Sequence, residues 1–365
     1  MTMRYISGFN AFVAKATGQV ISYIRDPKRY RLVDYVQMVR SPAPVGVYYK
    51  LDVDQPVRVE SVDEDAWADG AMRPRNTHNQ MRHDLVEFQC VRRNRGFEIG
   101  WQAIETADYK VLVAHSAMAQ NQLMVARTQR VITLLETAGT WPGMTDTANN
   151  LNGGAGQWDL GSDDPTDANY LSIKKTLDAV AERIHLKTNG MVGDPEGDTK
   201  LCLIISPRAA LKMSQSAEIH DYLKQSPFAM AQVKGAVPGQ NAKWGLPDHL
   251  YGDWKIVVEN AVRVSERPKA SGAEASITAG SPIPKRFVKG NDTAIVVSRP
   301  GGLDGQYGSP SFSTVQIYYY EKEMDIETRD LPWDRLTEGA VSENVKEVVP
   351  APQAGFLITD ILSTE

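Results

Sequence analysis

The chain has 365 residues, of which 42% are hydrophobic and 23% are charged, and its formal net charge is −5. This balance predicts a globular protein with a sizeable core and excludes both bulk disorder and a strongly basic nucleic-acid condenser. Cys90 and Cys202 are too few for a disulfide framework or a cysteine zinc site. Without an apolar run long enough for a membrane helix or a signal peptide, we expect a soluble protein that stays where it is made.

Residues 1–40 are basic, with seven lysines and arginines against two aspartates, and aromatic residues lie between them. This composition is typical of an arm that docks on acidic neighbours or on nucleic acid, although ordinary charge scatter on a surface gives a similar pattern. The candidate contact residues of this arm are Arg25, Lys28, Arg29 and Arg31.

Residues 57–98 hold seven arginines, and no lysine occurs between Lys50 and Lys110. Val57 and Val59 alternate as in an outgoing strand, and Val86 and Phe88 as in a returning one, so we expect a long two-stranded excursion. An isolated hairpin is marginally stable, and arginine forms bidentate pairs with carboxylates, so this excursion is expected to lie on another surface. The alternative is a solvated hairpin whose charges contribute nothing measurable.

The charged residues of this excursion are the candidates for contacts with a partner surface: Arg58, Glu60, Asp63, Glu64, Asp65, Arg73, Arg75, Arg82, Arg92, Arg93 and Arg95.

Residues 101–138 contain neither glycine nor proline and predict one long amphipathic helix. Its predicted packing stripe recurs every seven residues: Ile104, Val111, Met118, Val125 and Ile132. A coiled coil or filament would need a second apolar position in each heptad, and polar residues occupy that position, so a helix laid along a sheet is favoured.

The next part predicts an α/β module. After a polar loop over 144–167, a helix is expected from about Pro165, capped by Asp164 and buried through Ile173, Leu177, Val180 and Ile184. Residues 201–206 predict a buried strand, and Ser206 is expected to cap a helix that ends near Met213. Further strands are expected over 254–264, 293–298, 313–330 and 355–362, and the chain is acidic from residue 321 onward.

Signals for chemistry are weak. Gly153, Gly154 and Gly156 lack the strand and the Lys-Ser/Thr pair of a phosphate loop, and Ser172 with Lys175 has only the spacing of a Ser-Lys acyl-transfer enzyme. Asp159, Asp163, Asp164 and Asp167 do not have the spacing of a calcium loop, and the six histidines form no zinc motif. We therefore expect no enzyme, no metal and no cofactor.

The order of these parts resembles the major capsid protein of tailed double-stranded DNA bacteriophages, which has the HK97-like fold. The resemblance rests on this order and on the sequences of two segments, residues 139–180 and LCLIISPRAALKM at 201–213. It implies an α+β fold with an N-terminal arm at 1–40, a P-domain entry at 41–56 and an E-loop at 57–97. It also implies a P domain at 98–145 with its spine helix at 101–138, an A domain at 146–312 and P-domain strands at 313–365.

The resemblance further implies self-assembly as hexamers and pentamers into an icosahedral shell around the genome, in a virion assembled in the host cytoplasm. Expected partners are further copies of the chain, scaffolding and portal proteins, in some cases a decoration protein, and packaged DNA held non-specifically, with no membrane. Because the arm-like sequence starts at once, scaffolding is expected to come from a separate protein. In the capsid protein after which the fold is named, isopeptide bonds between lysine and asparagine, starting from the E-loop, cross-link the subunits of the shell. The excursion here has no lysine, so we predict that non-covalent contacts reinforce the shell.

Two alternatives remain open. An encapsulin nanocompartment shares the fold and encloses enzymes in place of a genome. A Ser-Lys acyl-transfer enzyme would need Ser172 and Lys175 in a cleft.

Overall fold

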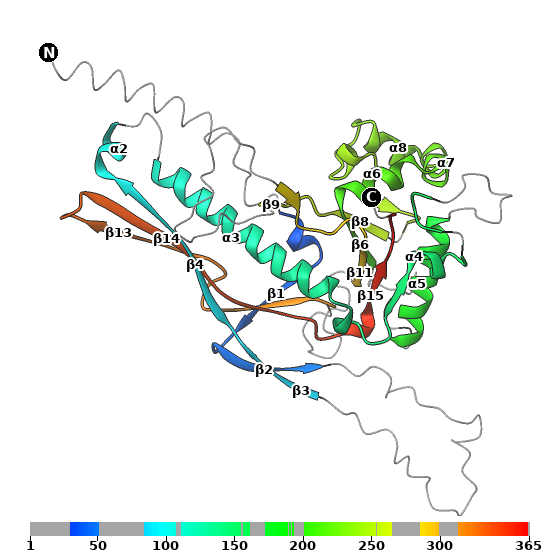
Figure 1. Ribbon diagram of the computed structural model, residues 1–365, viewed down its shortest axis with the longest axis horizontal. Helices are drawn as coiled ribbons and strands as arrows, with labels where there is room; N and C mark the ends of the chain where they lie inside the picture. Colours follow the sequence, from blue (N-terminus) through cyan, green and yellow to red (C-terminus); the bar gives the residue numbers. More distant parts are fainter. Residues whose placement is uncertain are drawn as a thin grey trace, which may run out of the picture.

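Two large β-sheets and one long helix, which lies along the first of them, organise the protein (Figure 1). The computed structural model describes residues 30–50, 84–106, 111–154, 156–160, 172–188, 190, 192, 201–252, 254–264, 285–298 and 313–363. The predicted arm residues before Tyr30 and most of the predicted excursion lie outside the described residues.

The first sheet has five strands, in the order β1-β12-β14-β13 with β4 on the other side of β14. Its strands are β1 (Gln37–Ser41), β4 (Val91–Gly100), β12 (Gln316–Tyr320), β13 (Asp325–Leu331) and β14 (Leu336–Val348). The long strand β14 pairs along one side with β4 and along the other with β12 and then β13, all antiparallel, while β1 joins β12 in parallel. Three separate parts of the sequence therefore meet on β14.

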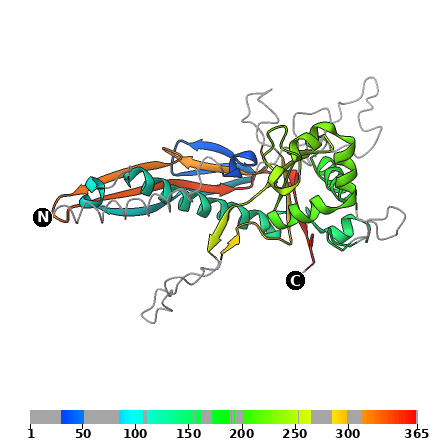
Figure 2. The ribbon, with the colours of Figure 1, turned by 90° about the horizontal axis from the view of Figure 1, so that it is seen from above.

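The long helix lies along one face of this sheet (Figures 1 and 2). It is described as α2 (Trp101–Thr106) and α3 (Val111–Glu136), with the four residues between them outside the described part. Of the predicted stripe, Val111 and Ile132 are buried and Val125 is partly buried, but Ile104 and Met118 are more than a third exposed in this chain. The stripe was wrong at Met118 because the buried face of α3 follows the 3.6-residue helical period, through Ala119, Leu123, Arg127 and Val131, and not a strict seven-residue repeat. Ile104 lies in α2 and is exposed there.

The end of α3 is tied to the second sheet through a buried ion pair. Lys289, whose side chain is fully buried, donates a hydrogen bond of 2.8 Å from Nζ to Glu136 Oε1. Burial lowers the pKa of Lys289, and the Glu136 carboxylate opposes that shift. This pair fixes the last turn of the helix to the loop before β11 (Ala294–Ser298).

A two-stranded ribbon leads into β4. It consists of β2 (Val45–Lys50) and β3 (Asp84–Gln89), which are antiparallel with Val45 opposite Gln89 and Lys50 opposite Asp84. The predicted returning strand is thus present, and its described partner is 45–50. Phe88 stacks on Tyr318 of β12 with ring centroids 4.4 Å apart, which seats the ribbon on the first sheet.

The second sheet has six strands in the order β5-β15-β11-β6-β8-β7. Its remaining members are β5 (Thr145–Thr147), β6 (Leu201–Ile205), β7 (His249–Leu250), β8 (Trp254–Val258) and β15 (Gly355–Thr359). All five residues of β6 are buried, which confirms the predicted interior strand. The expectation that 313–365 completes a single sheet was wrong for β15, which pairs with β11 and β5 because its wholly apolar strand fits an interior position.

Helices gather around the second sheet: α4 (Ala148–Leu151), α5 (Ile173–Lys187), α6 (Pro207–Gln215), α7 (Ala217–Gln225) and α8 (Pro227–Val233). Helix α5 buries the four predicted stripe residues fully, but its cap is Ser172 and not Asp164. Ser206 caps α6 as predicted, and Ser216 and Ser226 cap α7 and α8 in the same way.

The remaining elements are short. They are the turns η2 (Arg31–Asp34), η3 (Ala138–Thr140), η4 (Ala242–Trp244) and η5 (Pro352–Ala354) and the small ribbon of β9 (Val262–Val264) and β10 (Lys285–Phe287). Within the described residues, none of the helices combines the length and the apolarity that a membrane span requires.

Three predicted boundaries also need correction. The predicted arm ran to residue 40, but β1 begins at Gln37, and Leu32, Tyr35 and Val36 are buried. The predicted excursion ran to residue 97, but β4 enters the sheet at Val91. The predicted strand over 313–330 is two strands, β12 and β13, which follow β14 one after the other in the same direction; residues 321–324 interrupt the pairing, and Glu321 there has a left-handed backbone with φ of 63°.

Candidate functional site

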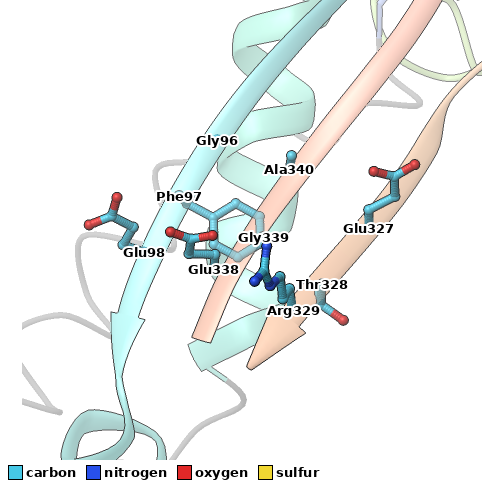
Figure 3. Close-up of a pocket in the computed structure, with 9 residues that line it drawn as sticks. All are labelled: Gly96, Phe97, Glu98, Glu327, Thr328, Arg329, Glu338, Gly339 and Ala340. Carbon is cyan, nitrogen blue, oxygen red and sulfur yellow. The ribbon is translucent and has the colours of Figure 1, made fainter. Parts of the chain in front are cut away.

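The candidate site is a hollow on the outer part of the first sheet, where β4, β14 and β13 run side by side (Figure 3). Its volume is about 730 Å³. The floor is the row of Gly96 and Ala340, which lie opposite each other in the ladder and carry almost no side chain. Glu98, Glu338, Glu327 and Arg329 stand around this floor.

The strand register decides which face each residue occupies. Directly opposite residues of an antiparallel pair share a face, and successive residues alternate. Val341 and Glu343 point toward α3, since Val341 packs in one cluster with Leu123 and Glu343 pairs with Arg127. The even-numbered residues of β14 and their opposite partners therefore face away from the helix. The β2–β3 ribbon lies on this face at Tyr318, opposite Lys346, whereas Gly96 and Ala340 lie in an open hollow on it.

On the helix side, a buried ion network holds α3 to β14. Arg127 donates from Nε to Glu343 Oε2 at 2.7 Å, and Arg130 donates to Glu343 Oε1 at 2.6 Å and to Glu347 Oε1 at 2.7 Å. The side chains of Arg127 and Glu343 are 1% and 0% exposed. Burial lowers the pKa of Arg130, but the carboxylates of Glu347 and Glu343 outweigh this effect and leave that pKa raised. Helix α3 is therefore held firmly on the face of the sheet opposite the hollow.

On the open side, carboxylates predominate. Glu98 and Glu338 lie directly opposite each other on β4 and β14, an arrangement of like charges that destabilises a sheet. Arg329 lies opposite Glu338 on β13. Glu327 forms an ion pair of 3.5 Å with Arg92, in which both side chains are more than 60% exposed, so it contributes little to stability. The hollow therefore presents three carboxylates and one guanidinium to the outside.

A second hollow of about 480 Å³ continues along the same face and shares Glu327 with the first. It is lined by Arg92 and by Asn344, whose buried Oδ1 accepts no hydrogen bond from the described residues. We call the two hollows together the sheet groove. Its residues include Arg92, Gly96, Glu98, Glu327, Glu338 and Asn344.

The β2–β3 ribbon offers a further uncovered surface. Phe88 on its inner face is buried against the sheet, whereas Val45, Val47, Tyr49 and Leu85 on its outer face are all more than half exposed. Apolar side chains gathered on one face of a thin ribbon are typical of a surface that another molecule covers.

The predicted contact residues are only partly brought together. Arg92, Arg93 and Arg95 are exposed on β4, with Arg92 beside the sheet groove and the other two on the α3 side. The other members of the predicted contact set lie outside the described residues: Arg58, Glu60, Asp63, Glu64, Asp65, Arg73, Arg75 and Arg82.

Of the predicted arm residues, only Arg31 is described, and the structure corrects its role. Its guanidinium donates to Gln240 and, at 3.3 Å, to Asn241 Oδ1, and it pairs with Asp34. Only 13% of its side chain is exposed. Arg31 therefore stabilises its own chain, because η2 packs against the loop between α8 and β7. Arg25, Lys28 and Arg29 lie outside the described residues.

No reactive constellation forms among the described residues. Ser172 Oγ accepts the Lys175 backbone N–H as a helix cap, while Lys175 Nζ donates to the Asn152 carbonyl. Asp159 accepts two hydrogen bonds from Ser363. Groups of three or more potential metal ligands are absent from the part of the chain that the structure describes, and Cys90 and Cys202 are free and buried.

Sequence reasoning missed both the sheet groove and the network behind it. A signal for the network existed: Arg127 interrupts the apolar face of α3 between Leu123 and Val131. An arginine on a buried helix face needs a buried carboxylate, but only the register of β14 identifies that carboxylate as Glu343.

Comparisons with known proteins rest on structure. No protein-family model matches the sequence, and no curated protein matches it. Among solved structures, a phage-related protein from Bordetella bronchiseptica RB50 matches over 90% of both chains with a TM-score of 0.54 and 11% identity. The helices and sheets described above confirm the expected α+β class, and this likeness, which at this identity shows the fold alone, is in keeping with the expected HK97-like architecture.

Two further matches score lower. The capsid structure of cyanophage P-SCSP1u covers 90% of this chain and 86% of its own, with a TM-score of 0.49 and 13% identity. The structure of Mycobacterium phage Che8 covers 88% and 86%, with a TM-score of 0.46 and 12% identity.

Proposed function

We propose that this chain is a capsid shell protein, the major capsid protein of a tailed double-stranded DNA bacteriophage. The observation that carries the proposal is the fold, which a phage-related protein shares over 90% of both chains. The order of parts along the sequence supports the same function. The role is structural and uses no catalytic residue and no cofactor.

The uncovered surfaces support self-association. A single copy leaves the outer face of the β2–β3 ribbon exposed and the hollows on β4–β14–β13 open. A monomeric protein gains nothing from such surfaces, whereas a shell subunit covers them with its neighbours. We propose hexamers and pentamers as the units, with the arginine-rich segment 57–95 among the contacts between neighbours.

Further partners follow from the proposal. Scaffolding, portal and decoration proteins would act on the assembled shell, and DNA would be held non-specifically because the chain as a whole is acidic. The place of assembly would be the host cytoplasm.

Electron microscopy of the purified full chain tests the function. We expect closed shells or rings of five and six subunits in negative stain, and a matching fast-sedimenting species. A chain that sediments as a monomer at every concentration and salt would contradict the proposal. Shells isolated from a phage-producing host that contain enzymes and no DNA would favour the nanocompartment alternative.

A further inference from the structure

We propose that the β9–β10 ribbon binds backbone phosphates of double-stranded DNA, with Arg263 and Arg286 as its clamp. The inference rests on the proposed function and deepens it by assigning the surface of the subunit that meets the packaged DNA. Three features of the described residues support it: the register of the ribbon, cations without counter-charges, and an electropositive hollow beside the ribbon.

The register of the ribbon places two arginines side by side. Arg263 of β9 lies directly opposite Arg286 of β10. Directly opposite residues of an antiparallel pair share a face, and their Cβ atoms lie about 4.5–5.5 Å apart. The two guanidinium groups can therefore converge on one anionic group, and in its absence their like charges destabilise the ribbon.

Neither arginine is neutralised within the part of the chain that the structure describes. Neither forms an ion pair or a hydrogen bond there, and the buried Nε of Arg263 has no acceptor. Arg286 and its neighbour Lys285 are exposed. Strands β9 and β10, each of three residues, together carry three cations and no carboxylate, in a chain whose net charge is −5. Such a local surplus of positive charge attracts a polyanion.

A hollow of about 1230 Å³ lies beside the ribbon and extends this positive surface. Val262 and Phe287, which are opposite each other in the ribbon, line it together with Lys243 and Trp244 of η4. Lys243 is exposed, and its Nζ lies over the Trp244 ring, 5.0 Å from the ring centroid. We call Lys243, Arg263, Lys285 and Arg286 together the basic ribbon surface.

The acidic charge of this hollow is already neutralised. Asp34, the one acidic residue among its described lining residues, pairs with Arg31 at 3.3 Å and with Lys255 at 2.6 Å. Lys243, by contrast, forms no ion pair with the described residues. The chain therefore supplies no counter-charge of its own to the basic ribbon surface from this side.

The position of the ribbon leaves room for an extended ligand. Figure 2 shows β9 and β10, in yellow, standing away from both large sheets on the side of the first sheet that carries α3. The β2–β3 ribbon lies on the other face of that sheet, where Phe88 stacks on Tyr318. The basic ribbon surface is therefore separate from the sheet groove and from the exposed face of the β2–β3 ribbon.

The number of cations favours DNA over a single acidic side chain of a protein. One carboxylate accepts one guanidinium fork, which would leave the second arginine unpaired. Duplex DNA carries one negative charge for about every 1.7 Å of its axis, so one duplex can meet all four cations. Contacts with phosphates carry no sequence information, which agrees with DNA that is held non-specifically.

Binding of a short fluorescent DNA duplex by the full, unassembled chain tests the inference, with fluorescence anisotropy measured over a range of salt concentrations. Arg263→Gln with Arg286→Gln removes the clamp, and Arg263→Lys with Arg286→Lys keeps its charge but removes the planar forks. The matched control is Lys187→Gln with Lys212→Gln, which removes two exposed cations from α5 and α6.

We expect the double glutamine variant of the clamp to bind the duplex about tenfold or more weakly. The slope of log affinity against log salt concentration should decrease by about 2, because two phosphate contacts are lost. The control should bind within about twofold of the original chain, since salt screens distant charges. The double lysine variant should bind less tightly than the original chain but keep its salt slope.

The melting temperature without DNA shows that the variants fold. It should be equal or higher in the double glutamine variant of the clamp, because a pair of like charges is removed. The inference is overturned if the duplex does not bind at low salt, or if it binds this variant as tightly as the original chain.

Inorganic phosphate distinguishes DNA from a free anion as the source of the phosphate. If phosphate raises the melting temperature of the original chain through the two arginines while the duplex does not bind, the clamp serves a free anion and the inference is wrong. Shells that form from a chain whose clamp ignores DNA would retain the proposed function and reject the inference. A chain that binds the duplex through both arginines but never forms shells would retain the clamp and reject the function.

Discussion

At the scale of single residues, buried charge decides how the long helix is seated. Glu343 is fully buried and accepts from both Arg127 and Arg130. Taking charges out of water is costly, and removal of one partner leaves the others uncompensated. The network therefore specifies one position of α3 on β14.

This predicts a large effect for one substitution. Glu343→Ala should lower the free energy of unfolding by about 3 kcal/mol, because Arg127 stays buried and loses its buried carboxylate, keeping only the half-exposed Glu323 as a partner. Unfolding of the unassembled chain in urea measures this loss of free energy. The matched control is Glu327→Ala, which breaks an exposed pair on the neighbouring strand and should cost at most about 1 kcal/mol. Equal losses in the two variants would show that the network does not seat the helix.

At the scale of elements, the packing of β4 on β14 depends on a glycine. A Cβ added at Gly339 would lie 2.2 Å from Cζ of Phe97, the residue directly opposite. At Gly96, one position along β4, the nearest atom would be 3.7 Å away. Neighbouring glycines in one sheet thus differ sharply in what they tolerate.

We therefore expect Gly339→Ala to destabilise the chain by about 1–3 kcal/mol, because the Phe97 ring must move away from its site on β14. Gly96→Ala should be nearly neutral. Thermal unfolding compares the two. The diagnostic variant is Gly339→Ala combined with Phe97→Leu, which should recover part of the loss relative to Phe97→Leu alone; a strictly additive loss would contradict the steric explanation.

Elements with a strong local signal could be predicted. The stripe of α5, the interior strand β6 and the serine cap of α6 depend on nearby residues, and each was found at its place. The heptad stripe was wrong at Met118, because the buried face of α3 follows the 3.6-residue helical period, and at Ile104, which is exposed on α2. Partners far apart in sequence, such as Glu98 and Glu338, become neighbours only through strand register, which local patterns do not contain.

At the scale of the whole molecule, the order of the segments along the sequence was enough to predict the fold. The same order did not predict which strands belong to which sheet. β14 and β15 are successive strands, yet they belong to different sheets. The turn η5 and the tight approach of Gly355 to Trp141 carry the chain from one to the other. Nothing in the composition of these strands distinguishes their sheets beyond the uninterrupted apolar character of β15.

The prediction for the whole molecule is that the subunits of an assembled shell are not joined by covalent bonds. Assembled particles denatured by detergent should run as a single monomer band, because the arginine-rich segment has no lysine amine between Lys50 and Lys110 to form an isopeptide bond. A parallel sample treated with an amine-reactive cross-linker should give a ladder and so verify that higher bands would be visible. A ladder in the untreated particles would refute non-covalent reinforcement.

The central position of β14 has a consequence for synthesis on the ribosome. Strand β4 is complete at Gly100, but its partner is translated only when residues 336–345 follow, some 236 residues later. Pairs so distant in sequence form slowly, and until then β4 is an unpaired edge. Nascent chains therefore cannot build the groove or offer it to one another, and recruitment of a subunit waits until its own translation is nearly finished.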